Sequence, residues 1–98
     1  MFKIVSVVDA TNDGIELYER FKGVFGEAIR AQMRCTSGYH DYELTLFNSD
    51  DDEMIFRGCF SAGYPGEGPR GTCRVLKDAG FDITDEFIKN HECFDIHK

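Results

Sequence analysis

The chain of 98 residues has no tryptophan, only two prolines and no Cys-x-x-Cys pair among its four cysteines. The cysteine spacing argues against zinc sites built from paired cysteines, and we expect no metal site. The first residues carry no export signal, so we expect reduced thiols and a cytoplasmic location. No apolar run approaches the roughly 20 residues that span a membrane, so we expect no membrane partner.

Basic residues are also scarce, since 11 Lys and Arg stand against 18 Asp and Glu and leave a net charge of −7. An acidic surface repels nucleic acid, so we expect no direct nucleic acid binding. The charge is uneven, however. Residues 57–77 carry +3 and leave −10 on the remainder, and their basic residues are Arg57, Arg70, Arg74 and Lys77.

What the chain does contain predicts one packed domain over residues 1–98, because 42% of the residues are hydrophobic and 13% are aromatic. Residues 2–8 (FKIVSVV) are rich in β-branched side chains and predict a central strand. Apolar residues then recur at helical spacing and predict a helix from about Asp13 to about Met33. Gly23 and Gly26 in that helix predict close packing against a neighbouring element.

Residues 39–47 (YHDYELTLF) and 53–60 (EMIFRGCF) alternate between apolar and polar side chains and predict a β-hairpin with an acidic loop. A helix is expected next, with Gly68 as its N-cap and Pro69 in its first position, and Gly80 is expected to end it. Residues 81–83 predict a short edge strand, and Thr84 is expected to cap a last helix.

These elements together predict an α+β fold in the order β-α-β-β-α-β-α. A small three- or four-stranded, mainly antiparallel sheet with helices packed on one face would satisfy that order.

The strongest local signal for function is the glycine-rich loop and helix start at residues 63–74 (GYPGEGPRGTCR). A helix N-terminus attracts phosphate, and glycines let the backbone approach a ligand closely. The letters match G-x-G-x-x-G, but a dinucleotide-binding fold needs a larger parallel sheet than this chain predicts. A purely structural loop and a protein contact are the alternatives. The expected ligand-binding residues are Arg57, Tyr64, Gly66, Gly68, Arg70, Gly71, Thr72 and Arg74.

The first functional hypothesis is therefore a binding protein that holds a phosphate-bearing, nucleotide-like small molecule, as a sensor or as a sponge that lowers the free ligand. Motifs that pair a nucleophile with a base, such as G-x-S-x-G or H-E-x-x-H, are absent from the sequence. We therefore expect no enzymatic activity, no catalytic residues and no cofactor.

The alternative hypothesis is a small acidic inhibitor that binds a basic protein partner and mimics nucleic acid. In size and charge the chain resembles phage-encoded counter-defence inhibitors such as anti-CRISPR proteins; the resemblance rests on no motif and carries over no residues. The partner-binding acids would be Asp50, Asp51, Asp52 and Glu53, with Asp41 and Glu43 on the same face. Both hypotheses are compatible with a homodimer through an edge strand or through the helix face that bears Gly23 and Gly26.

Overall fold

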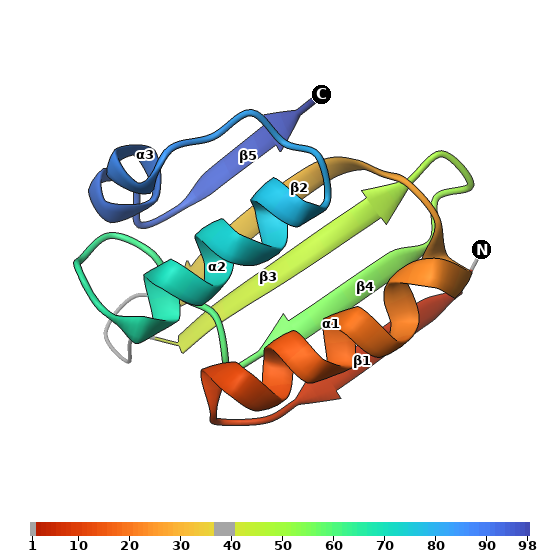
Figure 1. Ribbon diagram of the computed structural model, residues 1–98, viewed down its shortest axis with the longest axis horizontal. Coiled ribbons are helices and arrows are strands. Elements are labelled where there is room, and N and C mark those ends of the chain that lie inside the picture. The colour runs from red at the N-terminus through yellow and green to blue at the C-terminus, as the bar shows by residue number, and fades with distance from the viewer. Residues whose placement is uncertain (1, 37–40) are drawn as a thin grey trace.

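In the computed structural model, which describes residues 2–36 and 41–98, these residues form an α+β fold with a five-stranded mixed sheet and three helices (Figure 1). The strands lie in the order β1-β4-β3-β2-β5, and the helices lie on one side of the sheet. The elements are β1 (Lys3–Val7), α1 (Thr11–Phe25), β2 (Ala28–Thr36), β3 (Asp41–Asn48), β4 (Glu53–Arg57), α2 (Glu67–Asp78), α3 (Asp85–Asn90) and β5 (Phe94–His97).

The core lies between the helices and one face of the sheet. Alternation along the strands sends every second side chain to this face. The register places Leu44 beside Phe56 and Leu46 beside Met54, and all four side chains have no exposed surface. The opposite face carries the remaining side chains of each strand, and it includes Lys3, Val5 and Val7 of β1 and their neighbours in β4 and β3.

The sheet has more strands than the predicted three or four, and it is mixed. The residues of the predicted central strand form β1, which is an edge strand of the sheet and pairs with β4 in parallel. The predicted hairpin is confirmed as β3 and β4, and the amide of Asn48 donates to the carbonyl of Asp52 at 3.2 Å to close its turn. Tyr39 and His40, where that hairpin was predicted to begin, lie outside the described residues.

The predicted long helix is wrong beyond Phe25. Gly26 ends α1 with a φ of +83°, which favours glycine, and the chain then enters β2. Ala31 and Met33 are buried on the core face of β2. The residues after Gly26 therefore follow the period-2 pattern of a strand, although some of them also fit helical spacing. The expected close packing at Gly23 is also wrong, because a Cβ built there meets no atom within 4 Å.

The C-terminal region differs from the prediction as well. Residues 81–83 form no strand, and the last strand is β5, which pairs antiparallel with β2. Thr84 caps α3 as predicted, because its hydroxyl accepts a hydrogen bond from the amide of Phe87 at 3.1 Å. His91 has extended backbone angles and ends the helix after a short run of residues.

Helix α2 ends as predicted. The amide of Gly80 donates to Lys77 and the amide of Phe81 donates to Leu76, both at 3.0 Å, and Gly80 has a φ of +96°. These two bonds are those of a Schellman motif. The helix begins earlier than predicted, at Glu67, because Gly66 takes the N-cap position that was expected for Gly68.

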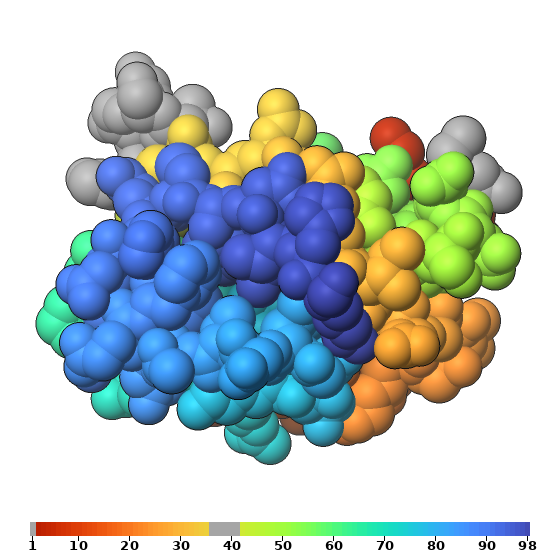
Figure 2. Space-filling view, turned by 90° about the horizontal axis from the view of Figure 1, so that it is seen from above, coloured from red at the N-terminus to blue at the C-terminus, as the bar shows by residue number. Residues whose placement is uncertain are grey.

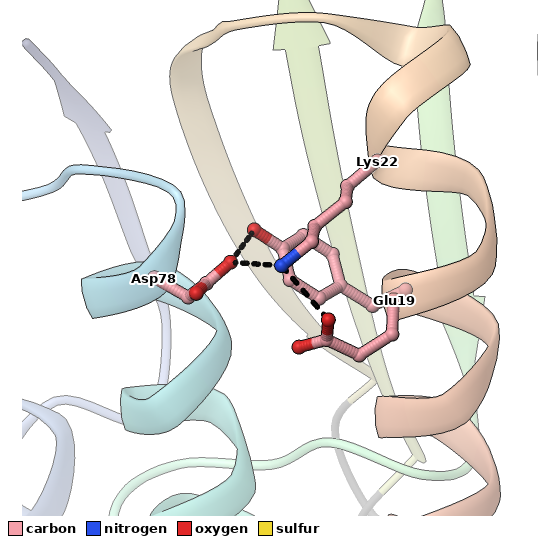
Figure 3. A network of polar contacts seen from close by, with 4 residues as sticks. Glu19, Lys22 and Asp78 are labelled. Atoms are coloured by element: carbon pink, nitrogen blue, oxygen red, sulfur yellow. Dashed lines mark hydrogen bonds and ion pairs between the residues drawn. The ribbon is translucent and has the colours of Figure 1, made fainter.

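A polar network joins α1 to α2 (Figure 3). The hydroxyl of Tyr18 donates to a carboxylate oxygen of Asp78 at 2.7 Å, and the ammonium of Lys22 lies 3.1 Å from the same oxygen. Lys22 also lies 2.8 Å from the carboxylate of Glu19. The network fixes the two long helices relative to each other across the sheet.

The view from the β5 side shows the C-terminal residues, in blue, over much of the visible surface (Figure 2). At the opposite edge of the sheet, β1 is the outermost strand (Figure 1). Within the described part of the chain, no helix is both long enough and apolar enough to cross a membrane.

Candidate functional site

A cavity of about 820 Å³ opens where the carboxyl ends of β1 and β4 meet. Val7 and Arg57 are the last residues of these two strands, and they stand side by side in the register. Ligands of open α/β sheets bind outside the carboxyl ends of parallel strands, where helix starts also gather. The lining residues are Val7, Asp9, Thr11, Tyr42, Glu43, Arg57, Gly58, Cys59, Phe60, Ser61, Tyr64 and Gly68.

Two helix starts contribute to this cavity. Thr11 begins α1, and Gly68 lies in the first turn of α2. In neither helix does the N-cap side chain bond the first turn, since the N-caps are Ala10 and Gly66. The first turns therefore present backbone N–H groups and the positive ends of two helix dipoles toward this end of the sheet.

The start of α1 is held in place by a side-chain contact. The hydroxyl of Thr11 donates to the carbonyl of Cys59 at 2.9 Å, which ties the start of α1 to the segment that follows β4. Gly14, one turn further along α1, packs so closely on Cys59 that an added Cβ would lie 2.5 Å from its sulfur. Burial raises the pKa of the Cys59 thiol to about 11, so this thiol is protonated at neutral pH.

Charged groups of both signs lie at the cavity. The guanidinium Nε of Arg57 donates to Glu43 at 2.7 Å, and Arg34 lies 3.9 Å from the other oxygen of the same carboxylate. Asp9 adds a second carboxylate to the lining. Arg34 lies outside the lining, so the lining itself carries one guanidinium, Arg57, and two carboxylates. The two helix dipoles add positive potential on the helix side of the cavity.

Hydroxyl groups form another part of the wall. The hydroxyls of Ser61 and Tyr64 lie 2.7 Å apart, and Tyr64 as a residue is 43% exposed. Tyr42 also lines the cavity, and burial raises the pKa of its phenol to about 12. Because Gly68 has no side chain, the α2 backbone lies against Ser61 and Tyr64, and a Cβ there would overlap the Ser61 hydroxyl.

Of the residues predicted from the glycine-rich loop, the structure places three in the cavity wall: Arg57, Tyr64 and Gly68. Gly66 takes the N-cap position of α2 behind the Tyr64 ring. Arg70 and Arg74 are exposed on α2 and do not belong to the lining.

The other two predicted residues have structural contacts. Thr72 is fully buried, and its hydroxyl lies 2.7 Å from the carbonyl of Ser61 and 3.1 Å from that of Gly68. Gly71 faces Thr11 and Phe60 so closely that a methyl group would overlap Thr11. These contacts position the loop, and they leave Gly71 and Thr72 beneath the cavity wall.

Sequence reasoning missed the cavity residues that come from other segments, among them Asp9, Thr11, Tyr42, Glu43 and Ser61. Asp9 and Thr11 directly follow the first strand, a position where binding residues often lie. These two residues can be recognised as candidates only when β1 is known to pair in parallel with β4.

The acidic residues of the alternative hypothesis lie in different surroundings. Asp50 and Asp51 are exposed in the turn between β3 and β4. Asp52 is buried, and its carboxylate accepts hydrogen bonds from the amide of Phe2 at 2.8 Å and from the side chain of Asn48 at 3.1 Å. Glu53 lies in β4 and is 3.7 Å from the ammonium of Lys3.

That hypothesis placed two further acidic residues on the same face. Glu43 is paired with arginines, and the side chain of Asp41 lies outside the described residues. In the described ranges, no group of three or more His, Cys, Asp or Glu side chains is arranged to hold a metal ion.

Comparison of the chain with protein-family models gave no match, and comparisons with curated proteins and with solved structures gave none either. The proposed function therefore rests on the fold and on the residues of the cavity.

Proposed function

We propose that this chain is a non-enzymatic binding protein that holds a phosphate-bearing, nucleotide-like small molecule in the cavity at the ends of β1 and β4. It would act as a sensor or as a sponge that lowers the free ligand. One observation carries the proposal: the cavity combines the ends of two parallel strands, two helix starts and the guanidinium of Arg57. The strand ends mark a position where ligands commonly bind, and the helix starts and the guanidinium favour an anionic group there.

The phosphate would lie near Gly68 and Thr11, where the first turns of α2 and α1 contribute backbone N–H groups. Arg57 stands at the strand end opposite these helix starts and is 52% exposed at its side chain, so it can exchange part of its bond to Glu43 for a phosphate oxygen. A guanidinium holds phosphate through paired N–H donors.

The remaining groups fit the rest of a nucleotide. Asp9 and Glu43 accept hydrogen bonds, as a ribose hydroxyl or a base amino group requires. Tyr64 is a partly exposed residue of the cavity wall, and its ring would provide the surface for base stacking. A ligand that carries an anion at one end and donors at the other matches the mixed charge of this cavity.

The candidate nucleophiles favour binding over catalysis. The thiol of Cys59 has a raised pKa and is buried, and a thiol in that state is a weak nucleophile. The hydroxyl of Ser61 is engaged with Tyr64. The cavity is therefore proposed to release its ligand unchanged.

The test compares two arginines that share one carboxylate. Arg57 lines the cavity, and Arg34 pairs with the same Glu43 from outside it. Isothermal titration with ADP-ribose, ADP and cyclic dinucleotides should show that Arg57→Ala weakens binding roughly 10- to 100-fold, because a charge-assisted bond is lost. Arg34→Ala should leave the affinity unchanged within about twofold. Equal losses in both variants would contradict this placement of the ligand.

A further inference from the structure

Strand β1 forms one edge of the sheet, and its backbone alternates between two directions. The carbonyl of Phe2 accepts from the amide of Glu53 at 3.0 Å, and the amide of Val8 donates to the carbonyl of Arg57 at 3.3 Å. In a parallel pair, residues that bond the neighbouring strand alternate with residues whose N–H and C=O point away from it. The even-numbered residues bond β4, so Lys3, Val5 and Val7 direct their backbone groups outward.

The side chains along this edge are largely apolar. Val5 is 47% exposed and Val7 is 70% exposed, on the face of the sheet that the helices leave uncovered. The other edge differs, because β5 carries the charged Asp95, which pairs with Arg30 at 2.6 Å, and an exposed His97. Charged side chains protect an edge strand against pairing with another chain, and β1 has only Lys3 for this purpose.

We propose that β1 pairs antiparallel with β1 of a second copy of the chain, about a twofold axis at Val5, so that one sheet continues through both copies. The register follows from the alternation. With the axis at Val5, Lys3 faces Val7 of the other copy, and all the outward backbone groups of Lys3, Val5 and Val7 find partners. The two Val5 side chains then lie side by side, an apolar pair at the centre of the interface.

The charges at the ends of β1 complement each other in this arrangement. Lys3 of the second copy lies beside Val7, and Asp9 follows two residues later, just past the end of β1, where the long lysine side chain can meet its carboxylate. Lys3 is 59% exposed at its side chain, where Glu53 is its neighbour at 3.7 Å, and Asp9 is exposed. The twofold axis creates the Lys3–Asp9 contact twice, and this contact favours the second copy over an unrelated strand.

The interface also reaches the cavity, because Val7 and Asp9 belong to its wall. The second copy would bring the ammonium of its Lys3 to the cavity mouth, where it adds a cation next to Arg57. This last step rests on the proposed ligand site, whereas the dimer itself does not.

The experiment measures molar mass by light scattering after size exclusion, over a series of protein concentrations. The proposal predicts a shift from the 11.2 kDa chain toward twice that mass as the concentration rises. Val5→Pro removes an outward N–H and no bond to β4, and proline is tolerated at such edge positions. The variant should raise the dissociation constant of the dimer by at least about tenfold, because two hydrogen bonds at the axis are lost.

His97→Pro is the matched control, because the amide of Lys98 bonds Ile29 at 3.1 Å and the antiparallel alternation then directs the N–H of His97 away from β2. It should dimerise like the unmodified chain. A single mass of 11.2 kDa for the unmodified chain at every concentration, or a dimer that survives Val5→Pro, would overturn the proposal.

If Val5→Pro fails to fold, an exchange of the charges at residues 3 and 9 provides a second test of the dimer. Lys3→Glu should weaken the dimer roughly tenfold, because it places like charges together, and the double variant Lys3→Glu with Asp9→Lys should restore it. A double variant that dimerises no better than Lys3→Glu would refute the register. Both readouts are masses and need no ligand, so a failure here is separate from a failure of the proposed function.

Discussion

The hydroxyl of Tyr18 in α1 donates a hydrogen bond of 2.7 Å to Asp78 in α2, and Tyr18 is only 4% exposed. Burial and this bond raise the pKa of the Tyr18 phenol, and the same bond, together with Lys22, lowers the pKa of the Asp78 carboxyl. One contact therefore joins the two helices whose first turns line the cavity. It also makes the stability of the fold depend on pH in both the acid and the alkaline range.

The first prediction concerns that pH dependence. The Asp78 contribution is present above the unfolded pKa of 3.8 and is lost as pH falls through the lower folded pKa. The Tyr18 contribution is present below the unfolded pKa of 10.0 and is lost as pH rises through the higher folded pKa. Urea unfolding should show that Tyr18→Phe costs about 1 kcal/mol near neutral pH and flattens the alkaline decline.

Glu19→Gln is the control for this prediction, because it removes only the partly exposed contact of Glu19 with Lys22. It should change the free energy of unfolding by less than about 0.5 kcal/mol. A Tyr18→Phe variant as stable as the unmodified chain, with the same alkaline decline, would show that the contact does not join the helices in solution.

The second prediction compares two glycines in helices. Gly71→Ala should destabilise the fold by about 1–3 kcal/mol, because the new methyl group overlaps Thr11 and crowds Phe60 beneath the cavity. Gly23→Ala should stabilise it by up to about 1 kcal/mol, because the site is open and alanine favours the helix. Thermal unfolding of the two variants measures both effects, and a Gly71→Ala variant as stable as the unmodified chain would count against the packing of α2 on α1.

The third prediction concerns the turn between β3 and β4. The carboxylate of Asp52 accepts from the amide of Phe2 and from Asn48, and the hydrogen bond from Asn48 is the main cause of its lowered pKa. An asparagine offers only one acceptor oxygen, so Asp52→Asn should lower the midpoint of thermal unfolding by several degrees. Asp50→Asn, at an exposed position, should leave the midpoint almost unchanged. Equal midpoints would contradict the anchoring of β1 through Asp52.

The fourth prediction concerns thiol reactivity. Burial raises the pKa of Cys59 and Cys73 to about 11, and a hydrogen bond to Glu92 at 3.0 Å is the main cause of a similar pKa at Cys35. Cys93 is exposed. A disulfide reagent near pH 8 should therefore modify Cys93 first and the other thiols much more slowly, because the thiolate is the reactive form. Cys93→Ser should remove the fast phase, and a fast phase that persists would disprove the assignment.

Local signals predicted the parts of the fold that local interactions decide. The stop of α2 at Gly80, the cap at Thr84 and the turn after Asn48 each depend on residues within a few positions, and each is confirmed. The parallel pairing of β1 with β4 and the addition of β5 depend on segments far apart in the chain. No local pattern contains that information, and the alternation of β2 after Gly26 also resembled helical spacing.

The residues of the candidate site also fall into two groups, those that the sequence could predict and those that depend on the fold. Arg57, Tyr64 and Gly68 could be predicted from the amino-acid composition, because a basic, glycine-rich loop before a helix is unusual in an acidic chain. Asp9 and Glu43 reach the same cavity only through the pairing of β1 and β3 with β4. The exposed position of Arg70 could not be predicted either, because it depends on how α2 lies on the sheet.

The most direct test of the ligand site is native mass spectrometry of the purified chain with a panel of nucleotides that includes cyclic dinucleotides and ADP-ribose derivatives. We predict a retained mass shift that corresponds to one nucleotide per cavity and that is strongly reduced in Arg57→Ala at the same nucleotide concentration. If no member of the panel produces a shift in the unmodified chain, the cavity does not bind nucleotides and the proposed function is wrong.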